Sequence, residues 1–129
     1  MTPREFLASL EFFGVRLGLE NITRLMDLSG KPHRAYPTVH IAGTNGKGSV
    51  AAFVSAMLRA AGYRVGLYTS PHLIDLNERM VIDGQPIDDI ALDASLACFQ
   101  NLCKDWETPP TYFEVATATA FHAFEKALI

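Results

Sequence analysis

The stretch Tyr36-Pro-Thr-Val-His-Ile-Ala42, followed by Gly43-Thr-Asn-Gly-Lys-Gly-Ser49, decides the fold class of this chain. The first half is short and partly β-branched, which is typical of a strand, and the second half is a glycine-rich turn. Over 50–61 the apolar side chains fall on one broad helical face, and Gly62 supplies a helix stop. Arg64–Tyr68 is another short apolar run. Strand, helix and strand within about 33 residues predict a parallel crossover unit, and therefore an α/β fold.

Two helices are predicted ahead of this unit. Thr2-Pro3-Arg4-Glu5 combines an N-cap hydroxyl, a proline at the first helical position and a glutamate that can return a hydrogen bond to the cap. A second helix is predicted from Asn21 until Gly30, a residue type that tolerates the left-handed conformation beyond a helix end. Residues 1–35 are thus expected to form a helical lead-in, and residues 36–129 the α/β portion.

Beyond the second strand, Thr69–His72 predicts a loop, Arg79–Ile82 a brief extended piece and Asp83-Gly84 a turn. A further helix is predicted from an apolar stripe, and Thr111–Glu114 is a second capping box that starts another helix after it. The stripe comprises Leu92, Leu96, Phe99, Cys103 and Trp106. His122, among Ala and Phe, is expected to be a packed histidine. An α/β unit should continue into a further strand, so we expect this sequence to be the first part of a longer domain.

Composition narrows the function classes. The chain has 129 residues, a formal net charge of −3 and no run of Lys or Arg longer than one residue, which argues against nucleic acid as the principal partner. No apolar stretch approaches the ~20 residues of a membrane span, and the N-terminus does not read as a signal peptide. Cys98 and Cys103 are expected to be reduced packing residues. We therefore expect a cytoplasmic protein.

The glycine-rich loop is the strongest chemical signal. Glycines bring successive N–H groups close to an anion, the following helix adds its positive end, Lys47 adds a mobile cation, and Ser49 adds a hydroxyl. The spacing departs from G-x-x-x-x-G-K-[ST], because Ile41 stands six residues before Lys47 and Gly48 separates the lysine from the hydroxyl. A merely flexible turn would not account for a lysine and a serine at a helix mouth. The predicted phosphate ligands are Gly43, Thr44, Asn45, Gly46, Lys47, Gly48 and Ser49.

Three motifs, His40–Ser49, Thr69–Leu73 and Asn77–Arg79, strongly resemble the N-terminal region of folylpolyglutamate synthase and dihydrofolate synthase, within the Mur ligase family. The resemblance implies a P-loop three-layer αβα domain with a mainly parallel sheet, of the Mur ligase central ATPase type. It implies ATP and Mg²⁺ as cofactors, and folate or dihydropteroate and L-glutamate as substrates. ATP would phosphorylate a carboxylate, and the amino group of glutamate would attack the acyl phosphate. At full length such an enzyme is expected to be a monomer.

By the same resemblance, Lys47 would be the catalytic lysine at the β- and γ-phosphates. Ser70 and Glu114 would be magnesium ligands that converge near the phosphate loop. The implied substrate residues are His72, Arg79 and Phe113. The resemblance also implies a C-terminal glutamate-binding domain and further metal ligands that this sequence lacks, so the chain alone is expected to be inactive.

Each implied role has a simpler alternative. Glu114 could serve only the capping box with Thr111, and Ser70 could be an ordinary turn former. His72 could be a surface loop residue, and Arg79 could pair within the protein instead of with a substrate carboxylate. For the whole chain, the alternatives are a P-loop switch or transport ATPase, which would predict the ordinary spacing, or a stand-alone nucleotide-binding module.

Overall fold

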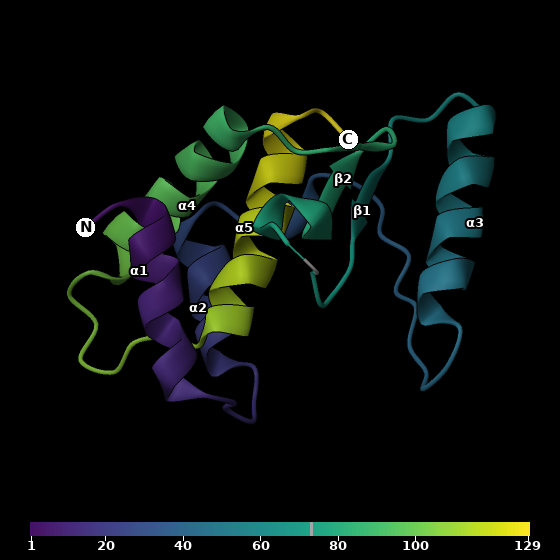
Figure 1. Ribbon diagram of the computed structural model, residues 1–129. Helices are drawn as coiled ribbons and strands as arrows, with labels where there is room; N and C mark the ends of the chain where they lie inside the picture. The colour runs from purple at the N-terminus through teal and green to yellow at the C-terminus, as the bar shows by residue number, and fades with distance from the viewer. Residues whose placement is uncertain (73) are drawn as a thin grey trace.

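The computed structural model describes residues 1–72 and 74–129, and it is mainly helical with one small sheet (Figure 1). In the described residues the α-helices are α1 (Pro3–Ser9), α2 (Glu20–Leu28), α3 (Lys47–Ala60), α4 (Asp89–Cys103) and α5 (Tyr112–Lys126). Short 3₁₀ helices are η1 (Leu10–Phe13), η2 (Pro32–Arg34) and η3 (Leu76–Arg79). The strands are β1 (Gly66–Tyr68), β2 (Met80–Ile82) and β3 (Gln85–Pro86). Leu73, the last residue of the Ser-Pro-His motif, lies outside the described residues.

Side-chain caps start three of the α-helices, α1, α4 and α5, and the sequence predicts two of these caps, at Thr2 and Thr111. The Thr2 hydroxyl accepts from the Glu5 amide at 3.1 Å, and the Glu5 carboxylate accepts from the Thr2 amide at 3.3 Å. The Asp88 carboxylate accepts from the Ala91 amide at 2.7 Å and opens α4. Each cap satisfies an amide that the first helical turn leaves without a partner. The predicted starts of α1 and α5 are thereby confirmed.

The core lies where α1, α2, α4 and α5 meet. Its buried side chains come from all four helices, from η1 and from β2, and the larger fully buried ones are Leu10, Leu25, Met80, Leu92, Leu96, Phe99 and Val115. β1 lies against the far end of α5: a Cβ at Gly66 would come within 2.8 Å of the Phe124 ring, so glycine allows this close approach. The predicted stripe of α4 is confirmed up to Cys103, where the helix ends, while Trp106 lies beyond it beneath the Arg24 guanidinium.

The sheet is antiparallel, with the order β1-β2-β3. Gly66 pairs with Ile82, and Tyr68 with Met80. Asp83 and Gly84 both have positive φ, 48° and 83°, as a tight turn between two antiparallel strands requires. The extended pieces predicted around β1 and β2 are confirmed, but β1 pairs antiparallel with β2 and not in parallel with residues 36–42.

The predicted strand over Tyr36–Ala42 is not formed, and this corrects the sequence prediction. A strand is stable when a neighbouring strand satisfies its N–H and C=O groups, and no strand of the described residues pairs with this segment. Val39 is accordingly 65% exposed. The parallel crossover, and with it the three-layer arrangement, is therefore not found in the described part of the chain. The helix that follows is present, and it begins at Lys47.

Helix α3 stands apart from the helical core, with β1 as its neighbour (Figure 1). None of its residues is buried, and the side chains of Val50, Phe53 and Met57 are 48%, 68% and 63% exposed. The apolar face that the sequence pattern marks thus remains open in this chain. In the described residues, no helix has the length and apolar character needed to cross a membrane.

Candidate functional site

Three elements have one end directed toward the same side of the molecule, the lower side in Figure 1. The three ends are the start of α3 at Lys47, the carboxyl end of β1 at Tyr68 and the start of α5 at Tyr112. These ends carry the glycine-rich loop Gly43–Ser49, the Ser-Pro-His loop Ser70–His72, and Glu114. Ligands of α/β proteins gather where strands end and helices begin, so this side of the molecule is the candidate site.

The glycine-rich loop has the backbone that an anion cradle needs. Gly43 and Gly46 have φ of 146° and 76°, values that residues with a Cβ rarely adopt. Gly46 is the N-cap of α3, and no side chain of the described residues caps this end. The first amides of the helix are consequently open to a ligand, at the positive end of a 14-residue helix. All of residues 43–49 are exposed.

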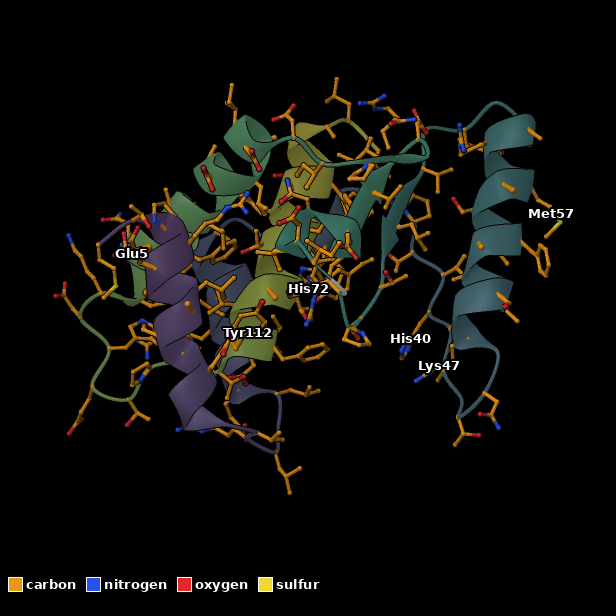
Figure 2. All side chains as sticks on the ribbon, in the orientation of Figure 1. Glu5, His40, Lys47, Met57, His72 and Tyr112 are labelled. Carbon is orange, nitrogen blue, oxygen red and sulfur yellow. The ribbon has the colours of Figure 1, made fainter. Side chains whose placement is uncertain are left out.

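Lys47 adds a cation at the same place. Its side chain projects from the first turn of α3, and Figure 2 shows it beside the chain segment that carries His40. Among the described residues it makes no ion pair. An unpaired lysine next to open amides can neutralise a phosphate group without first breaking an internal contact.

Glu114 occupies the N-terminal turn of α5 in two hydrogen-bonding roles. Its Oε1 accepts from the amide and the hydroxyl of Thr111, at 2.8 and 3.0 Å, which completes the predicted capping box. The same oxygen accepts from Asn21 Nδ2 at 3.2 Å, which joins the start of α2 to α5. The capping alternative is therefore confirmed as a structural role of this carboxylate.

Capping leaves part of the carboxylate open. All three hydrogen bonds reach Oε1, and no described residue donates to Glu114 Oε2. Ser70 is exposed at the end of β1, and its peptide bond to Pro71 is cis. One carboxylate oxygen and one hydroxyl are hard donors of the kind Mg²⁺ takes alongside several waters. The donor types fit this ion, although no three His, Cys, Asp or Glu of the described residues gather as a metal-binding group.

His72 and Arg79 are in direct contact. Arg79 Nε donates to His72 Nδ1 at 2.8 Å, and the Arg79 guanidinium lies 5.5 Å from the centre of the Tyr112 ring. Arg79 is only 9% exposed, whereas His72 is half-buried. Burial raises the pKa of Tyr68, while its hydrogen bond to Thr117 and the nearby Arg79 charge act to lower it. The arginine predicted as a substrate ligand thus has partners inside the protein.

Phe113 lies beside this cluster. Its ring centre is 6.5 Å from that of Tyr68, and its side chain is 55% exposed. An exposed ring on a fixed helix turn can stack on a flat ligand. Sequence reasoning missed Tyr68 and Tyr112 as neighbours of Arg79. The available signal was the Tyr-Phe pair inside the second capping box.

The structure brings together His72 with Arg79 and Phe113 with Tyr68. Within the described residues, no hydrogen bond or ion pair joins Gly43–Ser49 to Ser70 or Glu114. The convergence of Ser70 and Glu114 on one cation therefore stays a prediction.

The chain is similar to several curated proteins, although no protein-family model matches it. It is 45% identical over 126 residues to a probable bifunctional folylpolyglutamate synthase/dihydropteroate synthase of Haloferax volcanii, covering 95% of this chain and 15% of that protein. It is 42% identical over 118 residues to the dihydrofolate synthase/folylpolyglutamate synthase of Bacillus subtilis, covering 88% of this chain and 27% of that protein. The chain thus spans less than a third of these relatives.

Solved structures show the same likeness. A folylpolyglutamate synthase from Thermotoga maritima matches with a TM-score of 0.85 at 40% identity, over 98% of this chain and 31% of that one. The Escherichia coli protein FolC in complex with DHPP and ADP matches with a TM-score of 0.86 at 34% identity, again over 98% and 31%. The Mycobacterium tuberculosis folylpolyglutamate synthase complexed with ADP matches with a TM-score of 0.79 at 39% identity, over 98% and 31%.

Proposed function

We propose that this chain, a homologue of the folylpolyglutamate and dihydrofolate synthases over the part of those enzymes that it spans, is the N-terminal part of the ATP-binding domain of such a ligase. The reaction is the ATP-dependent addition of L-glutamate to a folate, with dihydropteroate as a second acceptor. The observation that carries the proposal is the uncapped start of α3. There the Gly43–Ser49 loop holds open amides beside an unpaired Lys47, and similar proteins bind ADP.

The residues suit phosphoryl transfer, which requires charge neutralisation and alignment more than covalent chemistry. The loop amides and Lys47 hold the β- and γ-phosphates of ATP, and Ser49 lies near them. An oxygen of the folate carboxylate accepts the γ-phosphoryl group, and ADP leaves. The amino nitrogen of glutamate then attacks the acyl carbon, loses a proton, and displaces phosphate.

Magnesium, when bound, neutralises phosphate charge during this transfer. Ser70 and the open oxygen Oε2 of Glu114 would hold the ion. Phe113 offers its exposed ring to the flat heterocycle of the folate, and His72 offers a ring nitrogen. The glutamate-binding site is assigned to the part of the relatives that this chain does not span, so the chain alone is proposed to bind nucleotide without ligase activity.

The proposal is tested by nucleotide binding to the purified chain. Lys47→Ala removes one charge-assisted contact, worth on the order of 1.5–3 kcal/mol, so affinity for a fluorescent ATP analogue with Mg²⁺ should fall roughly ten- to hundredfold. Arg59→Ala is the matched control, since Arg59 is a cation in the last turn of the same helix, and it should bind as the wild type does. Equal affinity of Lys47→Ala and wild type would remove the loop from consideration.

A further inference from the structure

The contact between Arg79 and His72 fixes which ring nitrogen of His72 carries the proton. Arginine is a donor only, and Arg79 Nε lies 2.8 Å from His72 Nδ1. Nδ1 must therefore be the acceptor, without a hydrogen of its own. The neutral imidazole then carries its proton on Nε2, so His72 offers an N–H group on the side of the ring that faces away from Arg79.

Arg79 is well suited to hold another side chain in place, because three elements fix it. It is the last residue of η3, its carbonyl accepts from the Thr69 amide at 2.9 Å just beyond β1, and its guanidinium lies over the Tyr112 ring of α5. Its side chain is nine-tenths buried. Because the Arg79 side chain is held by these contacts, few rotamers remain open to it. The direction of its Nε–H group is therefore set before any ligand binds.

We propose that Arg79 is a positioning residue for His72: it sets the tautomer and ring orientation so that Nε2–H of His72 donates to an anionic oxygen of a ligand bound at the Ser70–His72 loop. The inference rests on the proposed function and deepens it. We assign Arg79 an action through His72, since its Nε donates to that ring and the residue is only 9% exposed; the double variant below tests whether its terminal N–H groups reach the ligand instead. The acceptor is a carboxylate or phosphate oxygen, which either a folate or a nucleotide can supply.

The tautomer can be measured without any ligand. In the ¹⁵N-labelled chain at pH 8, long-range ¹H–¹⁵N spectra distinguish a protonated from an unprotonated ring nitrogen. The His72 signals are assigned by their loss in His72→Phe. The expected result is a single His72 species with bare Nδ1 and protonated Nε2. A wild-type His72 protonated on Nδ1 would overturn the proposal.

Variants of Arg79 test its part in the arrangement. Arg79→Met removes the donor and should bring out a population of His72 protonated on Nδ1, whereas Arg79→Lys keeps a buried cationic donor and should restore the wild-type signals. Arg64→Met is the matched control, because Arg64 donates to Asp83 and to the carbonyl of Ala127 instead. An unchanged His72 spectrum in Arg79→Met would overturn the positioning role. If Arg79→Met fails to fold, the positioning role of Arg79 is judged from the wild-type tautomer of His72 and from the His72 spectrum of Arg79→Lys.

Ligand titrations test the donor role of His72, with folic acid in one arm and ADP plus MgCl₂ in the other. His72→Phe should weaken binding in one arm by about ten- to hundredfold, as expected for a lost hydrogen bond to a charged acceptor. The double variant His72→Phe/Arg79→Met should bind no more weakly than His72→Phe, since Arg79 acts through His72. Additive losses would show that Arg79 contacts the ligand itself, and would overturn the proposal. Absence of binding in both arms would overturn the proposed function, while the ligand-free spectra would still decide the pairing of Arg79 with His72.

Discussion

At the scale of single residues, Glu114 shows how one carboxylate can serve a helix end and a ligand site. Its Oε1 accepts hydrogen bonds from the backbone amide and the hydroxyl of Thr111 and from the side-chain amide of Asn21. This leaves Oε2 for a cation. The capping box explains the hydrogen bonds that Oε1 accepts, but it gives no role to Oε2. The two roles can be separated because an amide side chain preserves a carbonyl acceptor and removes the negative charge.

We expect Glu114→Gln to retain most of the cap and to lose the magnesium-dependent part of nucleotide binding. Thr111→Ala should do the reverse: it costs about 0.5–2 kcal/mol of unfolding free energy through the lost cap and keeps the carboxylate. Urea denaturation without Mg²⁺ measures the first effect, and titration of a fluorescent ATP analogue with and without Mg²⁺ measures the second. If Glu114→Gln and wild type depend on Mg²⁺ equally, capping is the function that remains for this residue.

The sequence predicted the residue contacts that are local and missed those that are distant. The Thr111–Glu114 box has a separation of three residues and follows from helix geometry. The hydrogen bond from Asn21 to Glu114 spans 93 residues, and no periodicity encodes it. Arg79 was expected at a substrate, and its pairing with His72 depends on how η3 follows β1, which a single sequence does not determine.

At the scale of elements, helices were predicted well and one strand was not, for a physical reason. A helix satisfies its backbone within itself, so caps and apolar periodicity are enough to predict α1, α4 and α5. A strand requires a partner, and the segment Tyr36–Ala42 has the composition of a strand without a neighbour in the described residues. The hairpin of β2 and β3 supplies its own partner; the sequence predicted the extended piece of β2 and the Asp83-Gly84 turn, but not the second strand of the hairpin.

The α4–α5 contact leads to a prediction about pH. Ser95 Oγ lies 2.9 Å from His122 Nδ1, and the His122 ring meets Phe99 edge-on at 5.6 Å. Burial lowers the pKa of His122, and the Lys126 charge lowers it too, while Glu125 opposes the shift. The unfolded chain, with a histidine pKa near 6.5, therefore binds more protons than the folded chain as acid is added.

Stability from this contact should be complete above about pH 6.5 and should decline as the pH falls through that value toward the lowered pKa of the folded state. One proton limits the slope to about 1.4 kcal/mol per pH unit. Urea denaturation at a series of pH values checks this. His122→Phe cannot titrate, so its unfolding free energy should vary less over that window. Ser95→Ala should keep a titrating histidine. Identical profiles for wild type and His122→Phe would assign the acid sensitivity to other groups.

At the scale of the whole molecule, the chain divides into a packed helical core and an open helix. In the homologous solved structures, the segment that this chain matches makes up 31% of the whole chain. Apolar periodicity predicted that α3 is a helix with one apolar face, but periodicity says nothing about what covers that face. In this chain Phe53 lies in that face with 68% of its side chain exposed, whereas Phe99 of α4 is fully buried.

Replacing each of the two phenylalanines by alanine should therefore change the unfolding free energy by different amounts. Phe99→Ala removes buried surface and opens a cavity, which costs about 3–5 kcal/mol of unfolding free energy. Phe53→Ala removes a ring that is mostly in water already, so its effect should stay within about 0.5 kcal/mol. Urea denaturation of both variants at low protein concentration measures this difference without contributions from association. A loss above about 2 kcal/mol for Phe53→Ala would mean that the open face of α3 is packed within the isolated chain, and that the helix belongs to the same cooperative core as α4 and α5.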